Sequence, residues 1–248
     1  MTWLNNLFSS KAETIQNPIE WDMHNHLLFG IDDGSKTIEQ SLEMARKFVD
    51  LGYKKTISTP HVMFPYYPND ATIVRGKLAE LQKALVENDI ALETECAAEY
   101  YMDEVFLEKI RNKESLLTFN GNHLLIETSF LNQPVFFSQL MFEVKTQGYL
   151  PVYAHPERYV YLQKDYELIE KIADDGLLFQ INLLSLSGYY SPQAKKLAEW
   201  MIEHGYYHFL GTDAHHIKHL NSLDEVFKSK SFNKIDFGKV INARKSIL

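Results

Sequence analysis

The chain has 248 residues, of which 45% are hydrophobic and 23% are charged. This balance is typical of a folded globular protein and excludes a largely disordered or fibrous chain. The formal net charge of -8 disfavours a broad nucleic-acid interface, because phosphate backbones are held by lysine and arginine. Cys96 is the only cysteine, so no internal disulfide can form and a cytoplasmic location is expected.

The chain is predicted to have an N-terminal extension, residues 1–18, followed by a single domain over residues 19–248, because no Pro/Gly-rich linker or charge run divides it. Residues 1–8 contain apolar side chains but lack the basic region, long apolar core and cleavage site of a signal peptide. We expect them to pack on the domain or on a partner, with a short amphipathic anchor as the alternative. No stretch reaches the roughly 20 apolar residues that a membrane span needs.

Short apolar runs alternate with longer segments of helical period, a pattern typical of βα units around a parallel sheet. The predicted strands are residues 19–23, 55–59, 91–97, 123–127, 150–154, 177–181 and 208–211. The predicted helices are residues 38–51, 71–88, 103–112, 135–147, 166–175 and 193–204, and glycine follows four of them as a helix-end signal. This order predicts an α/β barrel, with residues 63–69 as a loop over its mouth. A Rossmann-type open sheet is the alternative, but its Gly-x-Gly-x-x-Gly signature is absent.

The first predicted strand ends in the sequence Asp-Met-His-Asn-His, residues 22–26. Residues two apart in a strand point to the same face, so His24 and His26 can reach one ion while Asp22 orients one of the two rings. Paired imidazoles suit Zn, Mn or Fe. An isolated His-x-His is often coincidental, so the motif gains weight from the other strand ends.

Further side chains of the ligand type follow the carboxyl ends of other predicted strands, where barrel enzymes place their active sites. They are His61, Glu99, Glu127, His155, Asp213 and His215. Each alone could be a helix cap or a solvated side chain, but capping does not explain six strand ends that share this feature. The set exceeds what one ion requires, so two or three metal ions are expected, with Glu99 and Asp213 as bridging carboxylates.

The sequence Gly-Ile-Asp-Asp-Gly, residues 30–34, follows the first histidines. One of its aspartates, Asp33 in preference to Asp32, is predicted to hold a further ion together with His61 and His215. The alternative is a turn that caps the helix beginning near Thr37.

Arg158 ends a His-Pro-Glu-Arg run at residues 155–158. Its planar guanidinium suits bidentate binding of phosphate oxygens, so we predict that it binds a substrate phosphate. The alternative is a surface ion pair with Glu157 or Asp165, and Glu157 is equally expected to be a solvated helix start. His219 is predicted to be a substrate-side group, because the three histidines at 215, 216 and 219 cannot all face one site.

With these residues laid out, the chain resembles the PHP (polymerase and histidinol phosphatase) superfamily. It is most similar to the bacterial CpsB/YwqE-type protein-tyrosine phosphatases of capsule and exopolysaccharide synthesis. The resemblance runs from about residue 20 to the C-terminus, and its specific stretches are residues 22–26, 30–34, 59–61, 98–101, 125–127, 151–158 and 213–215.

The resemblance implies a distorted (β/α)7 TIM-like barrel with three divalent metal ions, for which Mn is favoured and Fe or Zn are alternatives. The implied ligand sets are His24, His26, Glu99 and Asp213 for the first ion, Glu99, Glu127 and His155 for the second, and Asp33, His61 and His215 for the third. Arg158 would correspond to a substrate-binding arginine of the family. A second arginine, which family members tend to carry shortly after the Asp-x-His, is absent, and Lys218 or His219 is expected to substitute for it.

The expected reaction is attack on phosphorus by a hydroxide that bridges two metal ions, with His215 or His219 as general acid. The sequence contains no Cys-x5-Arg pocket, which excludes the cysteine-dependent tyrosine phosphatase mechanism. The resemblance implies a phosphotyrosine-bearing partner, namely the C-terminal tail of a membrane tyrosine kinase, and an oligomer is compatible with it. The alternatives are a histidinol-phosphate-type or other small-molecule phosphatase, an amidohydrolase, and a non-catalytic metal-binding scaffold.

Overall fold

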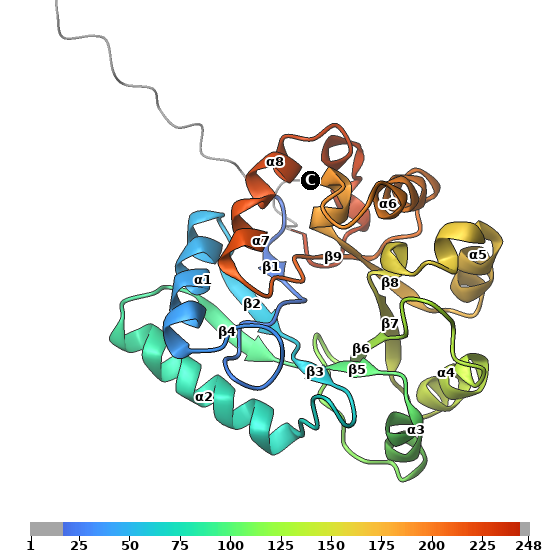
Figure 1. Ribbon diagram of the computed structural model, residues 1–248, viewed down its shortest axis with the longest axis horizontal. Helices are drawn as coiled ribbons and strands as arrows, with labels where there is room; N and C mark the ends of the chain where they lie inside the picture. Colours follow the sequence, from blue (N-terminus) through green and yellow to red (C-terminus); the bar gives the residue numbers. More distant parts are fainter. Residues whose placement is uncertain (1–16, 244–248) are drawn as a thin grey trace, which may run out of the picture.

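The structure is a computed structural model that describes residues 17–243. The expectations for residues 1–8 lie outside this range. Figure 1 shows the strands gathered at the centre of the molecule and the helices arranged around them. No helix in the described range is long and apolar enough to cross a bilayer.

All pairings between the named strands of the described chain are parallel. The strands are β1 (Trp21–Asp22), β2 (Lys55–Ser58), β3 (His61–Val62), β4 (Glu93–Cys96), β5 (Glu99–Tyr101), β6 (His123–Glu127), β7 (Leu150–Ala154), β8 (Leu178–Asn182) and β9 (Phe209–Gly211). They are hydrogen-bonded in the orders β1-β2-β4 and β3-β5-β6-β7-β8-β9. Only two residues separate β2 from β3, and likewise β4 from β5. Each of these pairs is therefore one interrupted strand position, and the nine strands make seven positions.

The barrel closes between its first and last strands. Asn25 and Ala214 form a parallel bridge. The amide of His26 donates to the carbonyl of Ala214 at 3.0 Å, and the amide of Asp213 donates to the carbonyl of His24 at 2.8 Å. This closed ring of seven parallel strand positions confirms the predicted distorted (β/α)7 barrel.

The longer helices of the described chain lie where the sequence predicts them. They are α1 (Ile38–Asp50), α2 (Ala71–Glu87), α3 (Glu104–Arg111), α4 (Phe137–Thr146), α5 (Tyr166–Asp174) and α6 (Pro192–His204). All but α4 follow a residue whose side chain accepts a hydrogen bond from a backbone amide in the first turn. These N-cap residues are Thr37, Asp70, Asp103, Asp165 and Ser191. Such caps explain why the helix starts can be predicted from sequence.

The sequence does not predict the short elements. They are α7 (Ile217–Asn221), α8 (Leu223–Phe227), η1 (Pro156–Arg158), η2 (Leu162–Lys164), η3 (Leu183–Ser187), η4 (Phe232–Lys234) and η5 (Phe237–Lys239). None exceeds five residues, so none shows a full helical period twice. Strands β3 and β5 are also missed, because His61 and Glu99 open them in place of apolar residues.

An apolar cluster that we call the barrel floor fills the interior of the barrel. Its members are Met23, Ile57, Ala97, Phe119, Leu125, Val152, Ala154 and Phe209, all of them buried. Residues two apart in a strand share a face, so Leu125 and Glu127 both point inward from β6. The floor therefore lies directly beneath the polar side chains at the carboxyl ends of the strands.

Candidate metal centre

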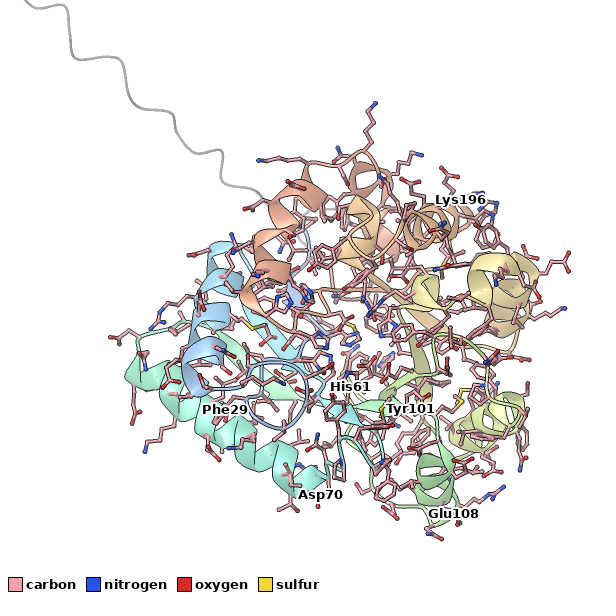
Figure 2. All side chains as sticks on the ribbon, viewed as in Figure 1. Phe29, His61, Asp70, Tyr101, Glu108 and Lys196 are labelled. Atoms are coloured by element: carbon pink, nitrogen blue, oxygen red, sulfur yellow. The ribbon has the colours of Figure 1, made fainter. Side chains whose placement is uncertain are left out.

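The nine ligand candidates of the sequence analysis lie together at the carboxyl ends of the strands, and we call this group the metal centre. Its members are His24, His26, Asp33, His61, Glu99, Glu127, His155, Asp213 and His215. Glu99 opens β5, Glu127 closes β6 and Asp213 follows β9, so parallel strands carry all three to one end of the barrel. Figure 2 shows polar side chains gathered at the middle of the ring, with His61 and Tyr101 close to them.

Glu99 is fully buried and contacts four imidazole rings, among them that of His26, whose Nε2 lies 3.6 Å from its Oε2. Its Oε2 lies 3.2 Å from Nε2 of His24 and 3.1 Å from Nδ1 of His61, and its Oε1 lies 2.9 Å from Nε2 of His155. Glu127 adds a contact of 2.9 Å between its Oε1 and Nδ1 of His61. Because the two oxygens of Glu99 face different rings, this carboxylate can serve two neighbouring ions.

Asp213 is a second buried carboxylate that contacts several imidazole rings of the metal centre. Its Oδ1 lies 3.5 Å from Nε2 of His24, 3.4 Å from Nε2 of His26 and 3.4 Å from Nδ1 of His215. Glu99 and Asp213 thus both contact Nε2 of His24.

Asp33 rather than Asp32 lies beside the histidines that are predicted to share its ion. The Oδ1 of Asp33 is 3.4 Å from Nε2 of His61 and 3.4 Å from Nε2 of His215. The capping alternative for this segment is wrong, because Thr37 is the N-cap residue of α1.

The ligand atoms form four compact groups, within each of which all atoms lie within 4.8 Å of one another. The groups are His26, Asp33, His61 and His215; His24, His26 and Asp213; His24, Glu99 and His155; and His61, Glu99 and Glu127. Several members belong to two groups, so the groups form one continuous centre. Its imidazole and carboxylate donors suit several transition-metal ions held close together.

Six buried atoms of the metal centre have no hydrogen-bond partner among the described residues. They are Nε2 of His24 and His26, Nδ1 of His61 and His155, Oε2 of Glu99 and Oε1 of Glu127. An unsatisfied buried polar atom costs about 1–3 kcal/mol, so such atoms are rare in folded proteins unless a ligand or an ion completes them. The donor set therefore fits metal ions, whose coordination can complete such atoms.

Two of the imidazole rings are oriented through their second nitrogen, as in many metal sites. The Oδ2 of Asp32 lies 2.7 Å from Nδ1 of His26, and the Oε1 of Gln180 lies 2.8 Å from Nδ1 of His24. Both contacts leave Nε2 facing the metal centre. Gln180 cannot be identified from the sequence, because its only signal is an inward position within β8.

Asp22 does not orient a histidine ring, so this prediction is wrong. Its carboxylate accepts hydrogen bonds from the amide of Thr212 at 2.8 Å, from Oγ1 of Thr212 at 2.9 Å and from Nδ2 of Asn25 at 2.9 Å. Burial raises the pKa of Asp22 to about 7. Asp22 therefore joins β1 to the segment that carries Asp213.

Neighbouring groups of opposite charge set the direction of the pKa shifts in the metal centre. Burial alone would lower the pKa of His26, but the Asp32 and Asp213 carboxylates together raise this pKa to about 10. Burial likewise opposes a charge on His24, yet Glu99 and Asp213 raise the pKa of His24. In return, although burial would raise them, the pKa values of Glu99 and Asp213 are held well below their usual range by His24. Metal ions would bind here by displacing imidazole protons.

The backbone of the metal centre adopts conformations that are uncommon for its residue types. His155 and Asp213 lie in the left-handed region, with φ of 33° and 49°. Such conformations cost of order 1–3 kcal/mol for a non-glycine residue and concentrate at functional sites. At Gly34, an added Cβ would meet the backbone oxygen of His26 at 2.3 Å, so only glycine lets this turn approach the histidine.

Arg158 lies beside the metal centre and is held by three neighbours. Its Nη1 donates to Oδ2 of Asp213 at 2.6 Å. Its guanidinium lies over the rings of Phe130 and Tyr190, 4.8 Å and 4.1 Å from their centroids. Stacking between two aromatic faces fixes the plane of the guanidinium.

Glu157 is not a solvated helix start, because it is fully buried. Its Oε1 accepts hydrogen bonds from the amide of Asn182 at 2.9 Å and from Oγ of Ser185 at 2.6 Å. The ion-pair alternative for Arg158 is also wrong, since Asp213 is its acidic partner in the described chain rather than Glu157 or Asp165.

A pocket of about 450 Å³ opens over the metal centre, and we call it the main pocket. The metal-centre members that line it are Asp33, His61, Glu127, His155, Asp213 and His215. Aromatic and aliphatic walls come from Tyr67, Tyr101, Phe130 and Leu131. Arg158 also lines the pocket. Tyr67 belongs to the segment that the sequence predicts as a loop over the barrel mouth, and it lies there as predicted. The main pocket thus combines a metal-binding base, one cation and an aromatic wall.

His219 lies behind His215 and is not among the residues that line the main pocket. Its Nδ1 accepts a hydrogen bond from the amide of His215 at 3.2 Å. Burial lowers the pKa of His219 to about 4, so the ring is neutral near pH 7. Lys218 is exposed on α7. A substrate-binding role for either residue stays a prediction.

The family model for capsular polysaccharide synthesis, CpsB/CapC, matches residues 20–228. The chain belongs to this family. Among curated CpsB/CapC relatives, the putative tyrosine-protein phosphatase CapC of Staphylococcus aureus is 33% identical over 196 residues, which cover 79% of this chain and 77% of that protein. The tyrosine-protein phosphatase YwqE of Bacillus subtilis is 32% identical over 200 residues, 81% of this chain and 79% of that protein.

Solved structures agree with the family and with the barrel. A crystal structure from the pair YwqE of Bacillus subtilis and CpsB of Streptococcus pneumoniae, described as metal-dependent tyrosine phosphatases, matches with a TM-score of 0.76 at 30% identity. The match covers 85% of this chain and 89% of that chain. Histidinol phosphate phosphatase of Lactococcus lactis matches with a TM-score of 0.52 at 13% identity, over 84% of this chain and 92% of that chain. This second likeness shows a shared fold alone.

Proposed function

We infer that this CpsB/CapC family member is a metal-dependent tyrosine phosphatase of capsule synthesis. The observation that carries the inference is the set of unpartnered imidazole and carboxylate atoms at the base of the main pocket. Relatives that are 32–33% identical are named tyrosine-protein phosphatases, and the matched structure at 30% identity is described as metal-dependent.

We propose that three divalent ions bind, with Mn favoured over Fe or Zn. Their ligands would be His24, His26, Glu99 and Asp213 for the first ion, Glu99, Glu127 and His155 for the second, and Asp33, His61 and His215 for the third. The compact group of His26, Asp33, His61 and His215 supports the third set. When bound, such ions lower the pKa of a water molecule toward neutrality and offset the negative charge of a phosphate.

Arg158 is our candidate for binding the phosphate group. It lines the main pocket, and Phe130 and Tyr190 hold the plane of its guanidinium. Burial would lower the pKa of Arg158, but Asp213 raises it, so the side chain stays charged. A guanidinium that is charged and fixed in its plane can donate two hydrogen bonds to phosphate oxygens. It can also stabilise the negative charge that develops as the phosphoryl group is transferred.

The wall of the main pocket suits an aryl leaving group. Tyr101, Phe130 and Leu131 supply apolar contact for a tyrosyl ring. As the water oxygen bonds to phosphorus, the bond from phosphorus to the tyrosyl oxygen breaks, and this oxygen takes up a proton. A phenol of pKa about 10 leaves with less protonic help than an aliphatic alcohol. His215 lines the pocket and is our candidate for the proton donor.

The physiological substrate that we propose is the phosphotyrosine-bearing C-terminal tail of a membrane tyrosine kinase. We propose that the phosphatase acts on this tail in the cytoplasm. The family resemblance supports the partner, and the single cysteine, Cys96, supports a reducing compartment. Leu131 lines the main pocket and is 66% exposed, so apolar surface beside the pocket is open to the rest of a polypeptide substrate.

A substrate comparison with added Mn tests this function. We expect turnover of p-nitrophenyl phosphate and of a phosphotyrosine peptide, with kcat/KM for the peptide at least about tenfold above that for L-histidinol phosphate. The variant His155→Ala should lose activity, whereas His204→Ala, which alters an exposed histidine on α6, should keep it. A preference for L-histidinol phosphate would establish the small-molecule alternative, and undiminished turnover by His155→Ala would contradict the metal mechanism.

A further inference from the structure

A second pocket, of about 170 Å³, lies next to the main pocket, and we call it the side pocket. Val62, Phe64, Val105 and Phe106 give it apolar walls. Tyr67 lines both pockets, so the two are neighbours that share one aromatic wall. The side pocket thus adjoins the proposed substrate site across Tyr67, although none of its lining residues belongs to the metal centre.

The amide, carboxylate and ammonium side chains around the side pocket already have partners. They are Asn69, which donates to the carbonyls of Ile31 and His61; Asp70 and Asp103, which cap α2 and α3; and Lys109, which pairs with Glu114. A charged ligand would have to compete with these contacts, whereas an apolar group would not. The side pocket therefore selects for apolar contact.

Apolar surface at the side pocket is open to solvent, and the pocket is formed in advance. Phe64 is 60% exposed and Val105 is 40% exposed. The loop that carries Phe64 is fixed at both ends, by the backbone bridge between Met63 and Tyr67 and by the hydrogen bonds of Asn69. Covering Phe64 and Val105 with another apolar group would be favourable, and little ordering of the loop would oppose it.

We propose that the side pocket binds one apolar side chain of the substrate polypeptide, close in sequence to the phosphotyrosine. The proposal rests on the tyrosine phosphatase function and names a sequence preference within it. A volume of about 170 Å³ suits a single aliphatic or aromatic side chain. An extended chain advances roughly 3.3–3.6 Å per residue, so a neighbour across one aromatic wall lies within about three residues of the phosphotyrosine.

A positional peptide panel tests the proposal on the full metal-loaded chain. The reference peptide has alanine at the three positions on each side of the phosphotyrosine, and each test peptide places leucine at one of these positions. We expect leucine at one position to raise kcat/KM roughly tenfold over the reference, mainly through KM, because part of one aliphatic side chain is buried. Aspartate or lysine at the same position should give no gain.

Two variants locate the effect in the side pocket. Val105→Asp should reduce the ratio of leucine to alanine at that position to about one and should create a preference for lysine there, which mere loss of folding cannot do. Val86→Asp is the matched control, because Val86 is 78% exposed on α2 and lines neither pocket. This control should keep the leucine preference. Phe64→Ala, on the opposite wall, provides a second variant that should also lower the ratio.

The outcomes separate the proposal from the function on which it rests. If p-nitrophenyl phosphate and all phosphotyrosine peptides resist hydrolysis, the tyrosine phosphatase function fails. If they are hydrolysed but no position distinguishes leucine from alanine, the side-pocket proposal alone is overturned. The side-pocket proposal would also be overturned if Val105→Asp and Phe64→Ala fold and still prefer the leucine peptide over the alanine peptide as strongly as the unaltered chain does.

Discussion

The barrel floor and the metal centre are built on the same strands and have opposite properties. Leu125 and Glu127 lie two residues apart on one face of β6, the first in the floor and the second in the metal centre. The floor is apolar throughout, so its burial stabilises the fold. The metal centre instead holds unpartnered buried polar atoms and two residues in left-handed backbone. The barrel floor therefore stabilises the fold, and the next inward-facing layer of side chains above it supplies the candidate metal ligands.

Among substitutions that leave every candidate metal ligand in place, Arg158→Lys is expected to cause the largest loss of catalysis. Lysine keeps the charge but lacks the planar fork that Phe130 and Tyr190 clamp. We expect kcat/KM for a phosphotyrosine peptide to fall about 100-fold, with the free energy of unfolding nearly unchanged. Steady-state kinetics and denaturant unfolding measure the two effects. Arg111→Lys, on the surface of α3, is the matched control. Equal activities for the two variants would show that Arg158 does not bind the phosphate.

A smaller effect is expected from Asp32→Asn, which acts on the metal centre through His26. The amide keeps the shape of the carboxylate but not the charge that holds Nδ1 of His26 at 2.7 Å. Changes of this kind typically weaken metal binding about 10- to 100-fold. A titration of Mn, followed by activity, should show the shift in half-saturation, and excess Mn should restore most of kcat. Asp89→Asn, in an exposed turn, should leave the titration unchanged; an unchanged titration for Asp32→Asn as well would contradict the orienting role.

The smallest effect on catalysis, with the largest on stability, is expected from Leu125→Ala in the barrel floor. Removing this fully buried side chain should lower the free energy of unfolding by about 2–5 kcal/mol. Activity per folded molecule should stay within about twofold, because the ligands above the floor remain in place. Val86→Ala, at an exposed position, is the control for both measurements. A hundredfold loss of kcat in Leu125→Ala at full folding would mean that the floor and the metal centre are not separable.

The sequence predicts which side chains gather at the metal centre because most of them lie at or near the carboxyl end of a strand position, and a parallel barrel brings these ends together. The strands at 123–127 and 150–154 are predicted with the bounds that the structure has. The groups that orient the ligands are harder to predict. Gln180 contacts His24 from 156 residues away, and nothing local marks it. The prediction for Asp22 fails for a related reason, since its carboxylate is occupied by Thr212 across the barrel seam.

The two aromatic rings that stack on Arg158 also cannot be predicted from the sequence. Phe130 follows β6 and Tyr190 follows η3, so the two rings meet the guanidinium only after the barrel has closed. Helices of eight residues or more are predicted because they have a period and, in most cases, a cap. The five-residue α7 and α8 are not, since one turn carries too little pattern.

The most direct test of the central claim follows bound metal and phosphatase activity together. The chain would be stripped with a chelator, titrated with Mn, and analysed at each step for bound ions per chain and for phosphate released from a phosphotyrosine peptide. We predict that the stripped chain is folded but inactive, that activity rises as the centre fills, and that three ions per chain are bound at saturation. Full activity in the stripped chain would contradict the account.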